Sequence, residues 1–256
     1  MKFKKILIAF ILASGLGISL NQPQTTAAMT KHQVITNIKK DIKTIHSGQL
    51  KQNIVAHYSG LNEAITSTAA FTNRPLLIHV NNQTLYNNKT TQTDEWLEPA
   101  TKRLYTRSNN QWYYKKLPAN YQTAANSLSS KAISKPLQQF INQSSKTAKL
   151  KKHGKTYTLS ANIADKKWFI KTISNLLTTK LNKTQLKDVK KHLKFKKIHV
   201  VLTVKGKKLI AAKAKVNLTY AKVLKATINE NLSQIGNFNN LTLPSAVKNA
   251  AKLPAN

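Results

Sequence analysis

Residues 194–216 read KFKKIHVVLTVKGKKLIAAKAKV and alternate apolar residues with lysines. A period of two places alternate side chains on opposite faces of a β-strand, and Gly206 stands where a hairpin turn is needed. The stretch therefore predicts a hairpin with one apolar face and one lysine face, which suits an antiparallel sheet packed on one side only. The apolar set expected of its first strand is Ile198, Val200, Leu202 and Val204.

The same alternation continues beyond the hairpin. Leu224, Ala226 and Ile228 predict a third strand. In the second strand, Lys213 and Lys215 are expected on the wet face with Asn217 and Thr219. The apolar face of that strand is expected to hold Ile210, Ala212, Ala214, Val216, Leu218 and Tyr220.

The rest of the chain mixes helical and strand periods. Residues 31–46 predict an amphipathic helix that stops at Ser47-Gly48, and Asp165 is placed to cap another helix. Helical spacing also marks residues 127–141, with Pro136 inside, and residues 184–193. Strands are expected within residues 50–60, 74–88, 102–117 and 149–163. The third range is expected to form a hairpin with its turn at SNN. One α+β domain is the expected architecture.

The charge of the chain limits the kinds of binding partner that are expected. The chain has 42 Lys and Arg against 8 Asp and Glu, a net charge of +34, and only Arg74, Arg103 and Arg107 are arginines. Base readout and bidentate phosphate binding favour the planar guanidinium. A lysine coat instead suits diffuse attraction to polyanions, so no specific nucleic-acid partner is expected.

Residues 1–28 predict a secretory signal peptide. Lys2, Lys4 and Lys5 precede the apolar run from Ile6 to Leu20, and small residues follow at the expected cleavage site. Cleavage after Ala28 would leave a chain that begins at Met29 with a net charge of +31. The sequence contains no cysteine, so no lipid-anchored cysteine is expected.

Export and charge together suggest where such a chain resides. The expected location is extracellular, on the wall of a Gram-positive cell, held by anionic polymers such as teichoic acids. A plain solvated surface and one specific anionic partner remain alternatives for the lysine coat. The expected polymer contacts are Lys205, Lys207, Lys208, Lys213 and Lys215.

Three segments resemble the LolA/LprG-like envelope proteins: residues 84–117, the strand triplet 195–235, and the ending NNLTLPSAVKNAA. The resemblance covers most of residues 29–256 and implies one α+β domain in which a curved antiparallel half-barrel sheet packs over helices. It also implies an apolar or lipid-like ligand between sheet and helices. The side chains expected to line that cavity are Leu77, Trp112, Ile170 and Leu202.

The other residues that could carry out chemistry favour structural rather than catalytic or metal-binding roles. Five aromatic residues could line a cavity, but a place in the core of a sheet is the simpler interpretation: Trp96, Tyr105, Trp112, Tyr113 and Tyr114. Tyr113 and Tyr114 must point to opposite faces of any strand. The seven histidines show no ligand spacing, which predicts no metal site or cofactor. No GxSxG motif occurs, and no enzyme is expected.

The stretch DEWLE carries three of the eight acidic residues. Its carboxylates, Asp94, Glu95 and Glu98, are expected on a short segment with turn character, beside the basic residues Lys102, Arg103 and Arg107. Paired carboxylates can hydrolyse glycosides or bind cations, but a role as ion-pair partners is the expectation here.

The sequence thus predicts a non-catalytic, secreted, wall-associated protein that binds an apolar or lipid-like ligand. The alternative is a cationic surface-layer-associated or adhesion protein without a small-molecule ligand.

Overall fold

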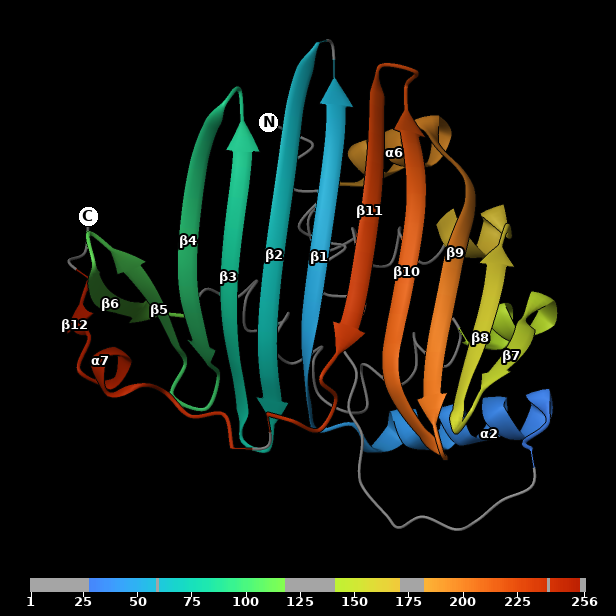
Figure 1. Cartoon of the computed structure of the whole chain (residues 1–256). Helices are drawn as coiled ribbons and strands as arrows, with labels where there is room; N and C mark the ends of the chain where they lie inside the picture. The colour runs from blue at the N-terminus through green and yellow to red at the C-terminus, as the bar shows by residue number, and fades with distance from the viewer. Residues whose placement is uncertain (1–27, 59, 118–140, 171–181, 239, 254–256) are drawn as a thin grey trace.

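The computed structural model describes residues 28–58, 60–117, 141–170, 182–238 and 240–253 of the chain. One open, curled sheet of twelve strands dominates it (Figure 1). The strands of the first half are β1 (Ser47–Tyr58), β2 (Leu61–Asn73), β3 (Leu76–Tyr86), β4 (Lys89–Glu98), β5 (Arg103–Ser108) and β6 (Gln111–Lys116). Those of the second half are β7 (Lys149–His153), β8 (Thr156–Ile163), β9 (Leu193–Lys205), β10 (Lys208–Tyr220), β11 (Leu224–Ser233) and β12 (Ala251–Lys252).

Two meanders meet in the middle of this sheet. The strand order is β12-β6-β5-β4-β3-β2-β1-β11-β10-β9-β8-β7, so the first half of the chain joins the second where β1 pairs with β11. Every pairing is antiparallel except that of β12 with β6. The expected fold class, a curved antiparallel sheet packed over helices, is confirmed.

Tight turns connect neighbouring strands. Asn87 and Asn88 join β3 to β4 with positive φ angles, and Asn109 and Asn110 join β5 to β6 in the same way. Asparagine tolerates this left-handed conformation better than most residues, because its short polar side chain bonds locally. The SNN turn is therefore confirmed, as is the turn at Gly206, whose φ is +60°.

The main core lies on one face of the sheet, here called the inner face. Alternate residues of β9 (Ile198, Val200, Leu202 and Val204) are all buried there, as predicted. Helix α2 (Lys31–Asp41) packs Val34, Ile35 and Ile38 onto it, and the short turn η1 (Ile42–Thr44) adds Ile42. In Figure 1 helix α2 lies behind the sheet, so the opposite, outer face is turned to the viewer.

Caps hold these helices at defined points. Thr30 and Gln33 form a capping box at the start of α2, and Asn182 and Gln185 form another at the start of α6 (Lys183–His192). Asp165 Oδ1 accepts a hydrogen bond from the Trp168 backbone N–H at 2.9 Å, which confirms the predicted cap of the helical residues 166–170. The α2 C-terminus is tied to the sheet because the Leu209 N–H donates to Asp41 Oδ2 at 2.6 Å.

A second, smaller core lies on the outer face of β3–β6. Leu77, Trp96 and Tyr105 pack there against Leu243 and Val247. Val247 belongs to the one-turn helix α7 (Ser245–Lys248), which the C-terminal segment brings to this end of the sheet. The prediction that the aromatic residues belong to a sheet core is therefore confirmed for Trp96 and Tyr105.

Two strands were not predicted, and two local expectations were wrong. Residues 61–73 and 89–98 are the long strands β2 and β4, although neither shows clean alternation. The 31–46 helix ends at Asp41, and Ser47-Gly48 begins β1, where a Cβ on Gly48 would stand 3.3 Å from the Phe71 ring. Ile210 is exposed because a register shift between Leu209 and Ala211 turns Leu209 inward in its place.

Two predicted helices, that of residues 127–141 and the one that begins after Asp165, fall largely outside the described residues. Of the 127–141 helix, Ile141 is described and is buried, and residues 141–147 are helical. The signal peptide assigned to 1–28 stays a prediction for the same reason. Among the described residues, no helix has the length and apolar character needed to cross a membrane.

Candidate functional site

A hollow of about 370 Å³ opens on the outer face of the central strands. β1, β11, β10 and β9 lie side by side there in the order of the sheet. Its outward side chains are basic or amide-bearing, apart from Val201. The residues that line it are Lys51, Asn53, His199, Val201, Lys213, Ala214, Lys215, Asn229, Glu230 and Asn231.

Strand register explains why these residues meet. Asn231 of β11 stands opposite Lys51 of β1 on one side and Lys213 of β10 on the other. Because neighbouring strands are about 4.8 Å apart, the two lysines flank the amide at a backbone separation of about 10 Å. A second row, two residues along the strands, runs Asn53–Asn229–Lys215–His199.

The charged side chains on the outer face of these four strands are all basic. Glu230 is the one acidic residue in the four strands, and its side chain turns to the inner face, where Gln52 Nε2 donates to Glu230 Oε1 at 2.6 Å. Each lysine carries a single mobile ammonium with three donors. The arrangement can thus bind an anion, and it offers no carboxylate to compete.

Asn231 adds a polar feature to the hollow. Its Oδ1 is buried and accepts no hydrogen bond from the described residues. Buried polar atoms normally meet a donor, from protein, water or ligand. A ligand that carried a hydroxyl group beside its negative charge would satisfy both the amide oxygen and the lysines.

The five predicted polymer contacts divide into two groups. Lys213 and Lys215 line the hollow. Lys205 and Lys208 face each other at the end of the β9–β10 hairpin, with Lys207 in its turn, and none of these three lines the hollow. Lys51 was missed, because LKQNIVAHY shows its strand period but gives no sign that β1 lies beside β11.

The four predicted cavity residues do not share a cavity. Leu77 and Trp112 belong to the outer-face core, whereas Leu202 lies in the inner-face core and Ile170 packs against that core. The sheet therefore separates the two pairs. The physical reason is strand parity: Leu77 alternates with Ile78, and it is Ile78 that enters the inner core.

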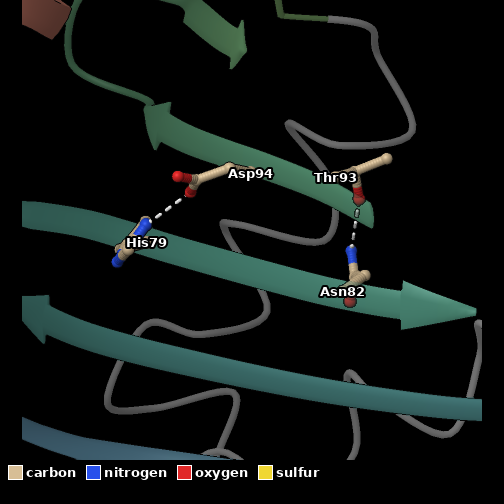
Figure 2. A network of polar contacts seen from close by, with 4 residues as sticks. All are labelled: His79, Asn82, Thr93 and Asp94. Atoms are coloured by element: carbon tan, nitrogen blue, oxygen red, sulfur yellow. Dashed lines mark hydrogen bonds and ion pairs between the residues drawn. The ribbon is translucent and has the colours of Figure 1, made fainter. Parts of the chain in front are cut away.

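The inner face contains a row of polar residues across five strands. Strand register aligns Glu230, Gln52, Ser67, Asn82 and Thr93. Ser67 and Asn82 are bonded to each other, and Asn82 Nδ2 donates to Thr93 Oγ1 at 3.3 Å (Figure 2). Gln52 is 1% exposed, and its Oε1 has no hydrogen-bond partner among the described residues.

The acidic stretch lies in β4, and the expectation of turn character was wrong, because β3 pairs with residues 94–97 and β5 pairs with residues 95–98. Asp94 is bonded to His79 at 2.6 Å on the outer face (Figure 2), and Glu98 stands opposite Arg103. Glu95 points inward, where burial raises the pKa of its carboxyl and Lys115 opposes the rise. Glu95 thus lies on the opposite face of the sheet from Asp94 and Glu98, and its carboxylate does not pair with either of theirs.

Metal ligation finds no support in the described ranges. Within them, no group of three or more His, Asp or Glu side chains comes together. His79 instead stacks on Trp96 with ring centroids 4.3 Å apart, and His192 is bonded to Asp188 in α6. Each of these two histidines thus has a structural contact.

The fold and the hollow define an α+β protein with an open antiparallel sheet and a cationic outer face. The chain belongs to a family of unknown function, DUF6612, whose model matches residues 30–252. No curated protein matches its sequence. Neither the family nor that search assigns an activity.

Three solved structures are similar to the chain at low scores. LprF from Mycobacterium bovis is 13% identical, with a TM-score of 0.45 over 84% of this chain and 96% of that one. The lipoprotein LppX of Mycobacterium tuberculosis is 9% identical, with a TM-score of 0.34 over 76% and 88%. A beta-barrel-like protein of the DUF1849 family from Brucella abortus is 7% identical, with a TM-score of 0.24 over 74% and 97%. These scores are too low to carry function across.

Proposed function

We propose that the protein is a secreted, non-catalytic protein of the cell wall that binds anionic wall polymers of the teichoic acid type through its outer face. The observation that carries this proposal is the hollow in which Lys51, Lys213 and Lys215 lie around the Asn231 amide, whose Oδ1 is buried, and the four strands turn no acid outward. Self-repulsion at the net charge of +31 expected after cleavage also favours a polyanionic surrounding.

Polyol phosphates fit the two kinds of side chain in the hollow. Their phosphates would meet the lysine ammonium groups, and their hydroxyl groups could donate to the buried Oδ1 of Asn231. Lysine rather than arginine suits such a flexible polymer, because a compact charge tolerates many phosphate orientations. Nucleic acid is a weaker candidate on the same ground and because of the expected export.

Salt extraction of intact cells tests wall retention. Roughly molar lithium chloride should release the protein without detergent, because screening and counterion competition weaken its attraction to polyanions. Burial of apolar surface responds in the opposite direction, since salt leaves it unchanged or strengthens it. A protein that stays on the cells in salt and leaves in mild detergent would contradict charge-based retention.

The expected export has its own test. N-terminal sequencing of the extracellular protein should find a chain that begins near Met29. Retention of Met1 in that fraction would contradict a cleaved signal peptide.

A second candidate function is the binding of an apolar or lipid-like ligand between sheet and helices. The observation that favours it is the inner polar row, where Gln52 is 1% exposed and its Oε1 meets no hydrogen-bond donor from the described residues. Rows of apolar residues flank it: Ile54 and Ile65 lie on one side, Leu50 and Ala69 on the other. An amphipathic molecule with one hydroxyl could match this pattern.

Native mass spectrometry of the extracellular protein tests the second candidate. A lipid-sized adduct should be present in the wild type and reduced in Gln52→Leu, which keeps the volume and removes the acceptor. Lys213→Gln on the outer face serves as the control and should retain the adduct. Absence of any adduct from freshly isolated wild type would count against the interior site and leave the outer face unaffected.

A further inference from the structure

Exposed apolar side chains gather at one end of the sheet. Seven large apolar residues are exposed in the described part of the chain, and five of them lie at the tips of three hairpins. Tyr58 and Leu61 flank the β1–β2 turn, Leu85 and Tyr86 precede the β3–β4 turn, and Val223 lies in the β10–β11 turn. Their exposed fractions run from 40% to 51%.

The three tips form one edge. The strands that carry them are adjacent in the order β4-β3-β2-β1-β11-β10, so the tips lie side by side at the upper edge of Figure 1. Six strands at about 4.8 Å spacing give that edge a width of about 24 Å. The apolar residues are thus spread along a line rather than gathered in one compact patch.

Lysines surround these tips. Lys89 stands opposite Tyr86 in the β3–β4 hairpin, and Lys222 lies beside Val223 in the β10–β11 turn. Lys194 and Lys225 face Thr219 from the two sides of β10, and all four lysines are exposed. The two acids nearby are engaged elsewhere: Asp188 is bonded to His192 and Tyr220, and Glu63 is half-buried on the inner face.

We propose that the three hairpin tips dock the protein on the surface of an anionic lipid bilayer. Tyrosine rings and short aliphatic side chains beside lysines suit the boundary between headgroups and acyl chains, where the ring is buried and the ammonium remains at the headgroups. A line of separate tips fits a planar bilayer better than a protein partner, whose interface needs a contiguous, well-packed area of about 800 Å² on each side. The net positive charge supplies the complementarity to anionic headgroups.

Vesicle sedimentation of the extracellular protein tests this docking. Wild type should bind phosphatidylcholine vesicles that contain phosphatidylglycerol and bind pure phosphatidylcholine weakly. The triple variant Leu61→Ser, Leu85→Ser, Val223→Ser should lose about tenfold or more in affinity, because it removes the inserted apolar groups and no charge. The matched control, Ile210→Ser with Leu253→Ser, changes two residues that are each 39% exposed away from the tips, and should bind like wild type.

The absence of native cysteine allows a direct measure of insertion. An environment-sensitive fluorophore on Val223→Cys should shift to the blue on phosphatidylglycerol vesicles, and the same dye on Ile210→Cys should not. Equal shifts at both positions, equal binding of the triple variant and wild type, or capture of the tips by a protein with no vesicle binding would each overturn the proposal. Thermal unfolding of every variant separates a binding defect from a folding defect.

Discussion

The two faces of the central strands share one backbone and differ in almost every side chain. On the inner face Leu202 and Ile228 are buried in a continuous core, whereas the outer face presents Lys213 and Asn229 around an open hollow. Packing dictates the inner residues, because a core has little room for alternatives. The outer residues of β1 and β9–β11 face no packed element of the described chain, so their lysines and amides point to binding rather than to folding.

The largest expected effect is a difference in stability between substitutions on the two faces. Leu202→Ala should lower the free energy of unfolding by about 2–5 kcal/mol, because it opens a cavity at a residue that is 1% exposed. Lys213→Ala, one strand away on the outer face, should change it by less than about 0.5 kcal/mol. Urea unfolding of the two variants measures both. Equal losses would mean that the outer lysine is also structural.

The outer face is open over the central strands and packed over β3–β6, where the small core lies. Val247→Ala should cost about 2 kcal/mol, because Val247 is buried against the small core of Trp96 and Tyr105. Thermal unfolding followed by tryptophan fluorescence checks this. A neutral result would show that α7 does not stabilise that end of the sheet.

A smaller effect concerns the tie between α2 and the sheet. Burial raises the pKa of the Asp41 carboxyl, while the Leu209 N–H and Lys208 oppose the rise. An acid with a raised native pKa binds its proton more tightly when folded, so stability is gained as the pH falls through that raised value and levels off below the ordinary value of 3.8.

Asp41→Asn keeps an acceptor for Leu209 and removes the titration. The stability of the wild type relative to this variant should therefore rise as the pH is lowered from neutral toward 3.8. Urea unfolding across that range provides the measurement. A relative stability that falls with pH would mean that the hydrogen bond outweighs burial and that the native pKa is lowered.

Sequence reasoning succeeded where a single strand period sufficed. The inner residues of β9 and β11 and the Asn and Gly turns were predicted, because each depends on neighbours along the chain. β2 was missed because its inner residues include Ser67 and Glu63 and its outer residues include alanines, so pairing with β1 and β3 defines it rather than its own pattern.

The hollow could be predicted only in part. Lys213 and Lys215 were identified from alternation, but Lys51 and Asn231 join them through the pairing of β1 with β11, which brings together residues far apart in sequence. The cavity assigned to Leu77, Trp112, Ile170 and Leu202 failed for a related reason. Without the register of β3, the parity that places Leu77 on the outer face could not be fixed.

The outer hollow is proposed to be a binding site and not merely part of a diffuse positive surface. Binding of the extracellular protein to purified poly(glycerol phosphate), measured over a range of salt concentrations, tests it most directly. The site variant is Lys51→Gln with Lys213→Gln and Lys215→Gln. The matched control carries the same charge change at three exposed lysines of the β7–β8 hairpin, Lys151, Lys152 and Lys155.

The site variant should lose on the order of a hundredfold in affinity, and its plot of log affinity against log salt should flatten by about 2 in slope, because up to three phosphate contacts disappear. The control should lose less than about tenfold, with little change in slope. Equal losses in the two variants would contradict the account, because they would show that only total charge matters.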